Sequence, residues 1–306
     1  MSIRPTSLLR WLMQAKRETG LLELTPIKET PIKELLSQAR NALTDSDTAQ
    51  LDAELLLSHQ LNKSRTWLHT WPDELIAKES ARAFNQLILR RQNGEPIAHI
   101  IGKQSFWSLE LKVTAETLIP RPDTELLVEE ALSTIPDDHP CTIADLGTGS
   151  GAIALAIASE RPNALITATD QSEAALQIAA ENAAAHQLSN VTFKQGSWFE
   201  PLQQQPFDLI LSNPPYIAEG DPHLSQGDVR FDPDSALSSG SSGLDDLQQI
   251  ISEAPQHLKT EGRLIVEHGY DQGKAVRSLF EQHHYRTVTT RRDLAGAERI
   301  SYGICP

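Results

Sequence analysis

Short apolar stretches alternate with longer amphipathic ones from Glu125 to the C-terminus. This order predicts a mostly parallel sheet with helices on both faces, because each parallel connection needs a crossover. Only residues 291–298 join the last two stretches, too few for a crossover helix, so we expect these to pair antiparallel at one edge. The expected strands are Thr142–Leu146, Leu165–Thr169, Val191–Lys194, Asp208–Leu211, Arg263–Glu267, Thr287–Thr290 and Arg299–Gly303, and the expected helices are Glu125–Leu132, Gly151–Glu160, Ser172–His186, Leu244–His257 and Gln272–His283. The pattern predicts an α/β fold with a seven-stranded, mostly parallel sheet.

Different patterns precede this α/β region. The first residues lack a regular period and are interrupted by prolines, which predicts a mobile leader. Apolar residues at helical spacing follow and predict a small all-α domain. The alternating stretch Phe106–Val113, preceded by Ile97–Ile101, predicts a connecting β-hairpin. The predicted division is a leader at 1–31, a helical domain at 32–93, a hairpin linker at 94–118 and the α/β domain at 119–306.

The chain has 306 residues with 27 basic and 41 acidic side chains, a net charge of −14. This negative charge repels polyanions, so we expect no direct contact with nucleic acid. Cys141 and Cys305 lie far apart and the ten histidines show no ligand spacing, so neither a disulfide framework nor a metal site is predicted. Every apolar run is shorter than the ~20 residues of a membrane span. We expect a cytoplasmic monomer that contacts no membrane.

A glycine-rich turn, Gly147-Thr-Gly149-Ser-Gly151, separates the first expected strand from a helix. Such turns let the backbone approach a ligand at the carboxyl edge of a sheet. The G-x-G-x-G spacing differs from the dinucleotide G-x-G-x-x-G, and Asp145 would repel a phosphate but suits an ammonium group. Asp170, at the end of the second strand, can accept hydrogen bonds from both ribose hydroxyls. These features fit S-adenosylmethionine, and the alternative is a turn needed only for strand–helix packing.

An Asn-Pro-Pro-Tyr turn, Asn213 to Tyr216, follows the fourth expected strand, which neighbours the first in this topology. Pro214 and Pro215 have no N–H, so the turn offers acceptors: the Asn213 side-chain oxygen and backbone carbonyls. These acceptors can hold both hydrogens of a planar NH2 group while its lone pair faces a sulfonium methyl and Tyr216 covers its flat face. Because an amide nitrogen has no accessible pKa, positioning and desolvation rather than a general base must supply the rate. The alternative is a Pro-Pro pair that only ends a strand.

The glycine turn and the Asn-Pro-Pro-Tyr turn together resemble the Rossmann-like class I S-adenosylmethionine-dependent methyltransferases that act on planar amino groups. The chain is more specifically similar to the release factor glutamine methyltransferases, also called HemK or PrmC, over about residues 32–303. This similarity rests on Gly94–His99, Phe106-Trp107, Ile119–Glu125 and Gly227–Phe231. It implies methylation of the side-chain amide of the glutamine in the Gly-Gly-Gln motif of peptide chain release factors, which would be the protein partners.

The resemblance also implies roles for individual residues of the α/β domain, which would be the catalytic domain. The cofactor would be bound by Asp145, Gly147, Thr148, Gly149, Ser150, Gly151, Asp170, Trp198 and Asn213, and the glutamine would be held for transfer by Asn213, Pro214, Pro215 and Tyr216. The chain departs from the family pattern at two places. Ser197 stands where relatives often have aspartate, which leaves an adenine contact there open, and residues 1–30 precede the usual start.

Three alternative functions are open at this point. A ribosomal-protein glutamine methyltransferase is disfavoured by the sequence Arg121-Pro-Asp-Thr. An adenine-N6 nucleic-acid methyltransferase would need a basic footprint, which this acidic chain lacks. A cofactor-binding module without turnover is disfavoured by the intact turn from Asn213 to Tyr216.

Several other residues have two interpretations each. Trp198 follows the third expected strand and would stack on adenine or be an ordinary buried aromatic. The stretches Asp221–His223 and Asp228–Phe231 would form a lid over the substrate or a solvated surface turn. Arg121, between two prolines, would face a bound release factor or pair with an acid of its own chain.

Overall fold

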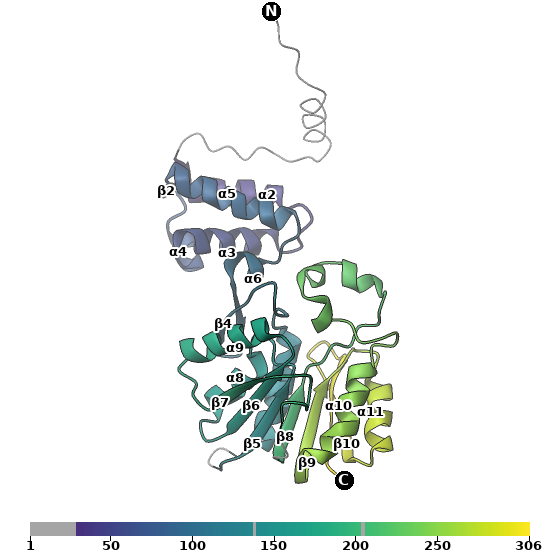
Figure 1. Ribbon diagram of the computed structural model, residues 1–306. Coiled ribbons are helices and arrows are strands. Elements are labelled where there is room, and N and C mark those ends of the chain that lie inside the picture. Colours follow the sequence, from purple (N-terminus) through teal and green to yellow (C-terminus); the bar gives the residue numbers. More distant parts are fainter. Residues whose placement is uncertain (1–28, 137–138, 203–205) are drawn as a thin grey trace, which may run out of the picture. The chain divides into compact units, whose positions relative to one another are not determined.

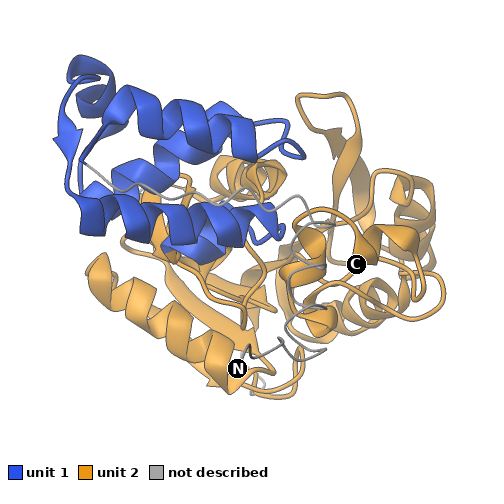
Figure 2. Ribbon diagram, turned by 90° about the horizontal axis from the view of Figure 1, so that it is seen from above, with its two compact units in different colours: residues 1–101 blue, residues 102–306 orange. Residues whose placement is uncertain are grey.

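A computed structural model describes residues 29–136, 139–202 and 206–306, which form two compact units (Figure 2). One unit extends to Ile101, and the other runs from Gly102 to Pro306. Residues 1–28 of the predicted leader lie outside the described residues. Strand β1 (Thr30–Pro31) pairs antiparallel with β2 (Leu75–Ile76), so the prediction of a mobile leader is wrong for residues 30 and 31.

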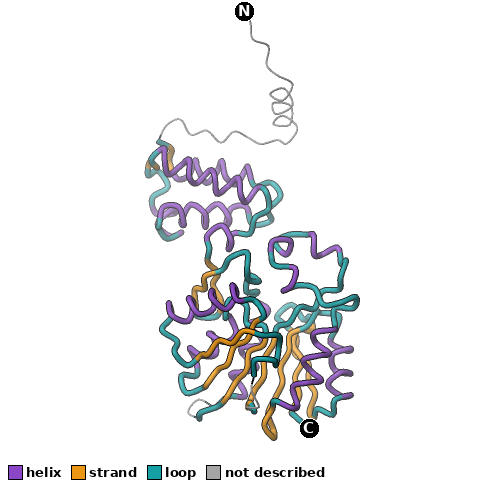
Figure 3. The backbone as a smooth tube through the Cα atoms, viewed as in Figure 1, coloured by secondary structure: helices purple, strands orange, loops and turns teal. Residues whose placement is uncertain are grey.

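The first unit is a small helical domain, shown in purple coils in Figure 3. Its apolar residues recur at intervals of three and four, which puts them on one face of each helix. Ile32, Leu35, Leu56, Phe84 and Ile88 are fully buried in the core of this unit. The helices are α2 (Ile32–Ala42), α3 (Ala49–Leu61), α4 (Arg65–Thr70), α5 (Lys78–Gln92) and α6 (Ile97–Ile101).

The connecting hairpin is shorter than predicted. Its strands are β3 (Lys103–Phe106) and β4 (Leu109–Lys112), whereas Ile97–Ile101, predicted to precede it in extended form, are helical. Pro96 is suited to a helix start, and Gly102 adopts a positive φ of 75°, which ends the helix before β3 begins. The hairpin therefore lies in the second unit, and its apolar side chains join that unit's core.

The second unit contains the predicted seven-stranded sheet, in the order β10-β11-β9-β8-β5-β6-β7. All pairs from β9 through β7 are parallel, and β11 is antiparallel to both of its neighbours, so the predicted antiparallel edge is confirmed. Strand β9 begins before the predicted Arg263, because Leu258 already pairs with Phe207 of β8. The strands are β5 (Thr142–Leu146), β6 (Leu165–Asp170), β7 (Val191–Gln195), β8 (Phe207–Ser212), β9 (Leu258–Glu267), β10 (Arg286–Arg292) and β11 (Glu298–Ile304).

Helices cover both faces of this sheet (Figure 1). Along β8, Leu209 and Leu211 contact one layer while Ile210 contacts the other, as the period of two in a strand requires. One layer is α7 (Glu125–Thr134), α8 (Ala152–Glu160) and α9 (Glu173–Ala185), and the other is α10 (Asp245–Glu253) and α11 (Gly273–Gln282). The helix predicted to reach His257 ends at Glu253 and continues as a 3-10 turn that contains Pro255.

One buried amide joins the hairpin to the glycine-rich turn. The Asn182 side chain of α9 accepts a hydrogen bond from the backbone N–H of Lys112 at 2.7 Å. It donates to the backbone carbonyls of Lys112 and Ser150 at 3.0 and 2.9 Å. The side chain is almost fully buried, so these bonds are sheltered from water. The Ser150 carbonyl of the glycine turn is thus also held by a side chain of α9.

Candidate active site

The carboxyl ends of the parallel strands bring the predicted site residues to one edge of the sheet. The glycine loop, Gly147–Gly151, follows β5 and is held by its backbone. Gly147 and Thr148 both donate their N–H groups to the Thr169 carbonyl at 2.9 Å, and Gly149 donates to Asp170 Oδ2 at 2.9 Å. A Cβ at Gly147, where φ is 72°, would lie 3.1 Å from the Trp198 ring. Glycine is therefore required here by both conformation and space.

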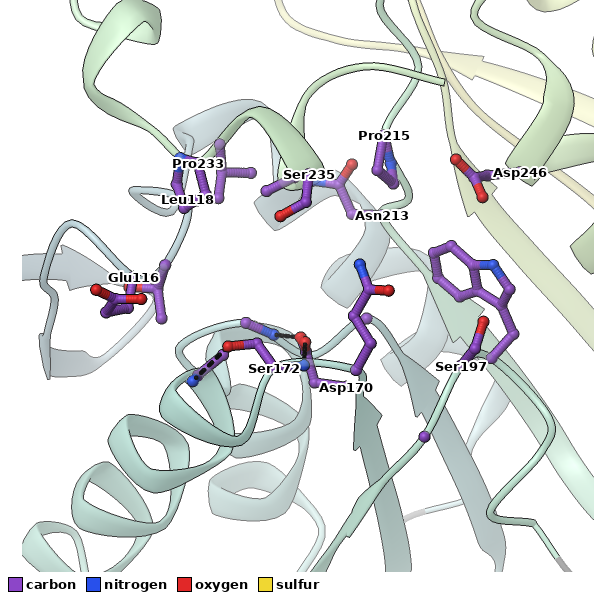
Figure 4. Close-up of a pocket in the computed structure, with 18 of the residues that line it drawn as sticks. Glu116, Leu118, Asp170, Ser172, Ser197, Asn213, Pro215, Pro233, Ser235 and Asp246 are labelled. Atoms are coloured by element: carbon purple, nitrogen blue, oxygen red, sulfur yellow. Dashed lines mark hydrogen bonds between the residues drawn. The ribbon is translucent and has the colours of Figure 1, made fainter. Parts of the chain in front are cut away.

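A cavity of about 300 Å³ opens beside this loop (Figure 4). Of the residues predicted for the cofactor or substrate, its wall includes Gly147, Gly149, Asp170, Trp198, Asn213 and Pro215. Thr148, Ser150 and Gly151 do not line it, because the first two side chains are buried beneath the loop and Gly151 starts the turn into α8. The volume is at the lower end of the range for small-molecule sites.

Asp145 lies beneath the glycine loop rather than on the cavity wall. Its Oδ2 accepts a hydrogen bond from the Thr148 hydroxyl at 2.6 Å, whereas Oδ1 is buried without a hydrogen-bond partner among the described residues. Burial raises the pKa of this carboxyl to about 6, and the Thr148 hydroxyl and the Ala154 N–H oppose that rise. Asp145 thus supports the glycine loop from beneath, and its contact with an ammonium group stays a prediction.

Asp170 ends β6 on the cavity wall, where it accepts backbone hydrogen bonds from Gly149 and Ser172, one on each oxygen at 2.9 Å. Burial raises the pKa of its carboxyl, and these N–H groups oppose the rise. Each carboxylate oxygen has a second lone pair, so both can still accept a hydroxyl. Trp198 and Ser197 also line this cavity. The arrangement fits a nucleoside with its ribose near Asp170.

The Asn-Pro-Pro-Tyr turn follows β8 and separates two cavities. Asn213 borders both the large cavity and a smaller one of about 80 Å³, whereas Pro214 and Tyr216 line only the smaller one. Asn213 donates its Nδ2 hydrogen to Thr124 Oγ1 at 3.1 Å, which leaves its oxygen as the acceptor. The Tyr216 hydroxyl donates to Glu267 Oε1 at 3.4 Å.

The two stretches predicted as a lid differ from each other. Asp221 and His223 are paired with each other at the surface, whereas Val229 lines the smaller cavity. Just beyond, the buried Asp232 accepts a hydrogen bond from the Ile119 nitrogen and pairs with Arg121. Arg121 therefore pairs with an acid of its own chain, and this pair fixes the second stretch beside the site. The segment folds as three 3-10 turns, Pro222–Ser225, Val229–Phe231 and Asp234–Ala236.

Several residues on the wall were not predicted from the sequence. They come from the segment before the α/β domain, from the turn between β6 and α9, from α9, from the residue after β7, from the segment after the second lid stretch and from α10: Glu116, Thr117, Leu118, Gln171, Ser172, Ala175, Gly196, Pro233, Ser235, Ala236, Asp246 and Gln249. Some of them could have been predicted from their neighbours in the sequence. Gln171 and Ser172 directly follow Asp170, and Leu118 directly precedes Ile119-Pro120. Residues from α10 carry no motif of their own.

The described residues contain neither a group of metal ligands nor a membrane-spanning helix. In the part of the chain that the structure describes, no three His, Cys, Asp or Glu side chains are grouped to hold a metal ion. Likewise, none of the described helices is long and apolar enough to cross a membrane.

Comparison with known proteins relates this chain to methyltransferases. Residues 34–102 match the family described as the PrmC N-terminal domain, and residues 137–297 match a methyltransferase domain. The release factor glutamine methyltransferase of Pseudomonas aeruginosa is 52% identical over 261 residues, which cover 85% of this chain and 94% of that protein. The enzyme of the same name from Aliivibrio fischeri is 48% identical over 275 residues, 89% of this chain and 96% of that protein.

A solved structure supports the fold alone. The catalytic domain of hMettl16, in complex with an RNA hairpin of MAT2A, is 14% identical with a TM-score of 0.54, over 76% of this chain and 84% of that one. The sequence relatives are far more similar and cover both units of this chain. The chain therefore belongs to the release factor glutamine methyltransferases, which are S-adenosylmethionine-dependent protein-glutamine N-methyltransferases.

Proposed function

We propose that this chain methylates the side-chain nitrogen of the glutamine in the Gly-Gly-Gln motif of release factors. The reaction would take place where the cavity of about 300 Å³ meets the cavity of about 80 Å³. The observation that carries this proposal is the position of Asn213, which borders both. A methyl donor in the larger cavity and an amide in the smaller one would meet at this residue. This division fits the prediction that Gly147, Gly149, Asp170 and Trp198 bind the cofactor, since they line the larger cavity. It also fits the prediction that Pro214 and Tyr216 hold the amide, since they line the smaller one.

The large cavity would bind the cofactor through groups of different chemistry. Asp170 would accept the ribose hydroxyls, Trp198 would cover the adenine, and the backbone of Gly147–Gly151 would contact the amino-acid part. Asp145, predicted to receive the ammonium group, lies off the cavity wall and would act on the cofactor through the loop that it supports at Thr148. When bound, S-adenosylmethionine supplies a methyl group on a positively charged sulfur.

The Asn213 oxygen and the carbonyl of Pro214 would accept the two hydrogens of the glutamine amide. Because Asn213 uses its own NH2 on Thr124, its oxygen is the atom that remains for the substrate. These two hydrogen bonds would orient the amide so that its nitrogen lone pair faces the methyl group. On transfer, the nitrogen would gain the methyl group that the cofactor supplies, the electrons of the broken carbon–sulfur bond would stay with sulfur, and the nitrogen would lose one proton to water. Orientation and exclusion of water supply the rate.

Other parts of the chain would contribute to substrate choice. The helical domain would contact the release factor at a distance from the glutamine, since the amide alone does not distinguish one protein from another. The substrates act in translation, so the enzyme would work in the cytoplasm.

Mass spectrometry of a purified release factor, incubated with the enzyme and S-adenosylmethionine, tests this proposal. We expect one added methyl group, on the motif glutamine, and none on a release factor in which that glutamine is alanine. Purified ribosomal proteins and an adenine-containing RNA serve as parallel substrates and should stay unmodified. Methylation of either of these in preference to the release factor would contradict the proposal.

A further inference from the structure

The last residue of β9 and the residues that follow it contact Tyr216 at two separate atoms. We name this segment, Glu267–Gln272, the β9–α11 turn. Its first residue hydrogen bonds to the Tyr216 hydroxyl, and its last hydrogen bonds to the Tyr216 carbonyl. β9 lies directly beside β8, so the turn is the nearest neighbour of the Asn-Pro-Pro-Tyr loop on that side of the sheet. No sequence motif marks this turn.

Gln272 uses every polar group of its side chain to join three segments. Nε2 donates to the carbonyls of Tyr216 and Gly243 at 2.9 and 3.1 Å, and Oε1 accepts from the Gly269 nitrogen at 2.8 Å. A Cβ at Gly243 would lie 2.3 Å from the Tyr216 carbonyl oxygen, so only glycine lets these two carbonyls share one donor group. This arrangement fixes the backbone of Tyr216.

Glu267 holds the other end of the same residue. Only 1% of its surface is exposed, and its Oε1 accepts the Tyr216 hydroxyl at 3.4 Å. Its Oε2 is buried with no well-oriented partner among the described residues, although the Thr124 hydroxyl stabilises the ionised form. Thr124 also accepts the hydrogen bond from Asn213. Glu267 is thus near both ends of the Asn-Pro-Pro-Tyr loop. A buried carboxyl is costly to keep, which argues for a use.

We propose that Glu267 and Gln272 are positioning residues for methyl transfer, which hold Tyr216 by its hydroxyl and its carbonyl and thereby set the place of the substrate amide. The inference rests on the proposed function, in which Tyr216 covers that amide. Neither residue lines either cavity, so they act through Tyr216 and not on the reacting atoms.

The surroundings of Glu267 make its charge sensitive to pH near neutrality. The pKa of Glu267 is raised to about 7, chiefly by burial and in small part by Asp123, while Thr124, Arg299 and Tyr216 oppose the rise. The carboxylate accepts the Tyr216 hydroxyl more strongly than the neutral acid does. Turnover of the wild-type enzyme should therefore rise through pH 7, and a neutral amide at position 267 should remove that part of the rise.

A double-mutant cycle on the full chain tests the inference, with turnover on release factor as the measurement. The variants are E267Q, Y216F, their combination, and Q272E, in which a carboxylate would face two carbonyls. We expect about a tenfold loss of turnover for E267Q and at least that for Q272E, because small displacements of a reacting group have effects of this size. Glu281→Gln and Gln282→Glu, at exposed positions of α11, are matched controls expected to keep wild-type rates.

The cycle separates positioning through Tyr216 from general loss of structure. We expect E267Q to lower turnover in the Tyr216 enzyme but not in the Y216F enzyme, with cofactor affinity within about twofold of wild type in all variants. An unchanged E267Q rate, equal losses in both backgrounds, or a loss confined to cofactor affinity would overturn the inference. A wild-type enzyme that left the motif glutamine unmodified would contradict the proposed function instead.

Discussion

The two loops that meet at the site are held in opposite ways. The glycine loop is fixed by hydrogen bonds of its own backbone N–H groups, to Thr169 and Asp170. The Asn-Pro-Pro-Tyr loop lacks two of these donors, and it is held by side chains from elsewhere, namely Thr124, Glu267 and Gln272. Both loops follow neighbouring parallel strands, β5 and β8.

This difference matches what each loop has to do. The glycine loop uses most of its N–H groups for its own support, and its glycines leave open space in which a ligand can approach the backbone closely. The loop after β8 presents acceptors to an amide and must hold them still while bonds change. Removing donors from a loop leaves it without local support, so the support has to come from other segments of the chain.

The largest expected effect comes from removing the amide acceptor itself. Asn213→Ala should lower turnover on release factor by about a thousandfold, because the lost contact orients the nitrogen in the transition state. Cofactor affinity, measured by equilibrium titration, should stay within about threefold. Wild-type single-turnover rates in this variant would mean that Asn213 only ends a strand.

Asn213→Asp tests the acceptor role of the Asn213 oxygen more closely. It keeps an acceptor of nearly the same shape but adds negative charge, which stabilises the positively charged cofactor more than the transition state. It also loses the donor to Thr124. We expect an active enzyme that is slower than wild type and faster than Asn213→Ala. A rate below that of Asn213→Ala would contradict the acceptor role.

The glycine loop should show its sensitivity in stability rather than in rate. Burial raises the pKa of Asp145 from 3.8 to about 6, so the folded enzyme holds a proton there that the unfolded chain releases. The stability of wild type relative to Asp145→Asn should therefore fall as pH rises from 4 to 7, by about 3 kcal/mol. Chemical unfolding without cofactor at each pH measures this. Asp271→Asn, at an exposed position, should show no such trend.

A smaller effect is expected at Asp170, which borders the same loop. Asp170→Ala should weaken cofactor binding by ten- to a hundredfold, because two hydroxyls lose charge-assisted acceptors worth about 1.5–3 kcal/mol each before relaxation and water replacement. Asp170→Asn, which keeps one acceptor oxygen, should lie between this variant and wild type. An unchanged dissociation constant in a folded variant would remove Asp170 from the cofactor site.

The smallest effect on the loops should follow removal of the first unit. A chain that starts at Gly102 keeps the hairpin and both loops, and its cofactor affinity should stay within about twofold of wild type. Its efficiency on whole release factor should fall about tenfold, because contacts away from the glutamine are lost. A short Gly-Gly-Gln peptide should be methylated equally by both chains. Equal rates on the whole release factor would contradict a recognition role for the helical domain.

The sequence predicted the sheet, its edge and the glycine loop because these depend on local patterns. Alternating strands and helices, and glycines at φ values that other residues avoid, are visible in a few consecutive residues. The hairpin start was missed because the Ile97–Ile101 run has no alternation, so only Gly102 marks where the helix ends. Glu267, Gln272 and Thr124 were missed because they reach the Asn-Pro-Pro-Tyr loop from segments 50 or more residues away, which no spacing reveals.

The buried Asn182 amide has a consequence for how such enzymes diversify. It anchors β4 and the glycine loop to α9, so the whole hairpin is built into the catalytic unit. The junction at Gly102 is then a natural point for recombination, because a new N-terminal module joined there would leave every contact of the anchor intact. In evolutionary terms, the second unit can take a different N-terminal module at Gly102 without rebuilding the contacts of this anchor.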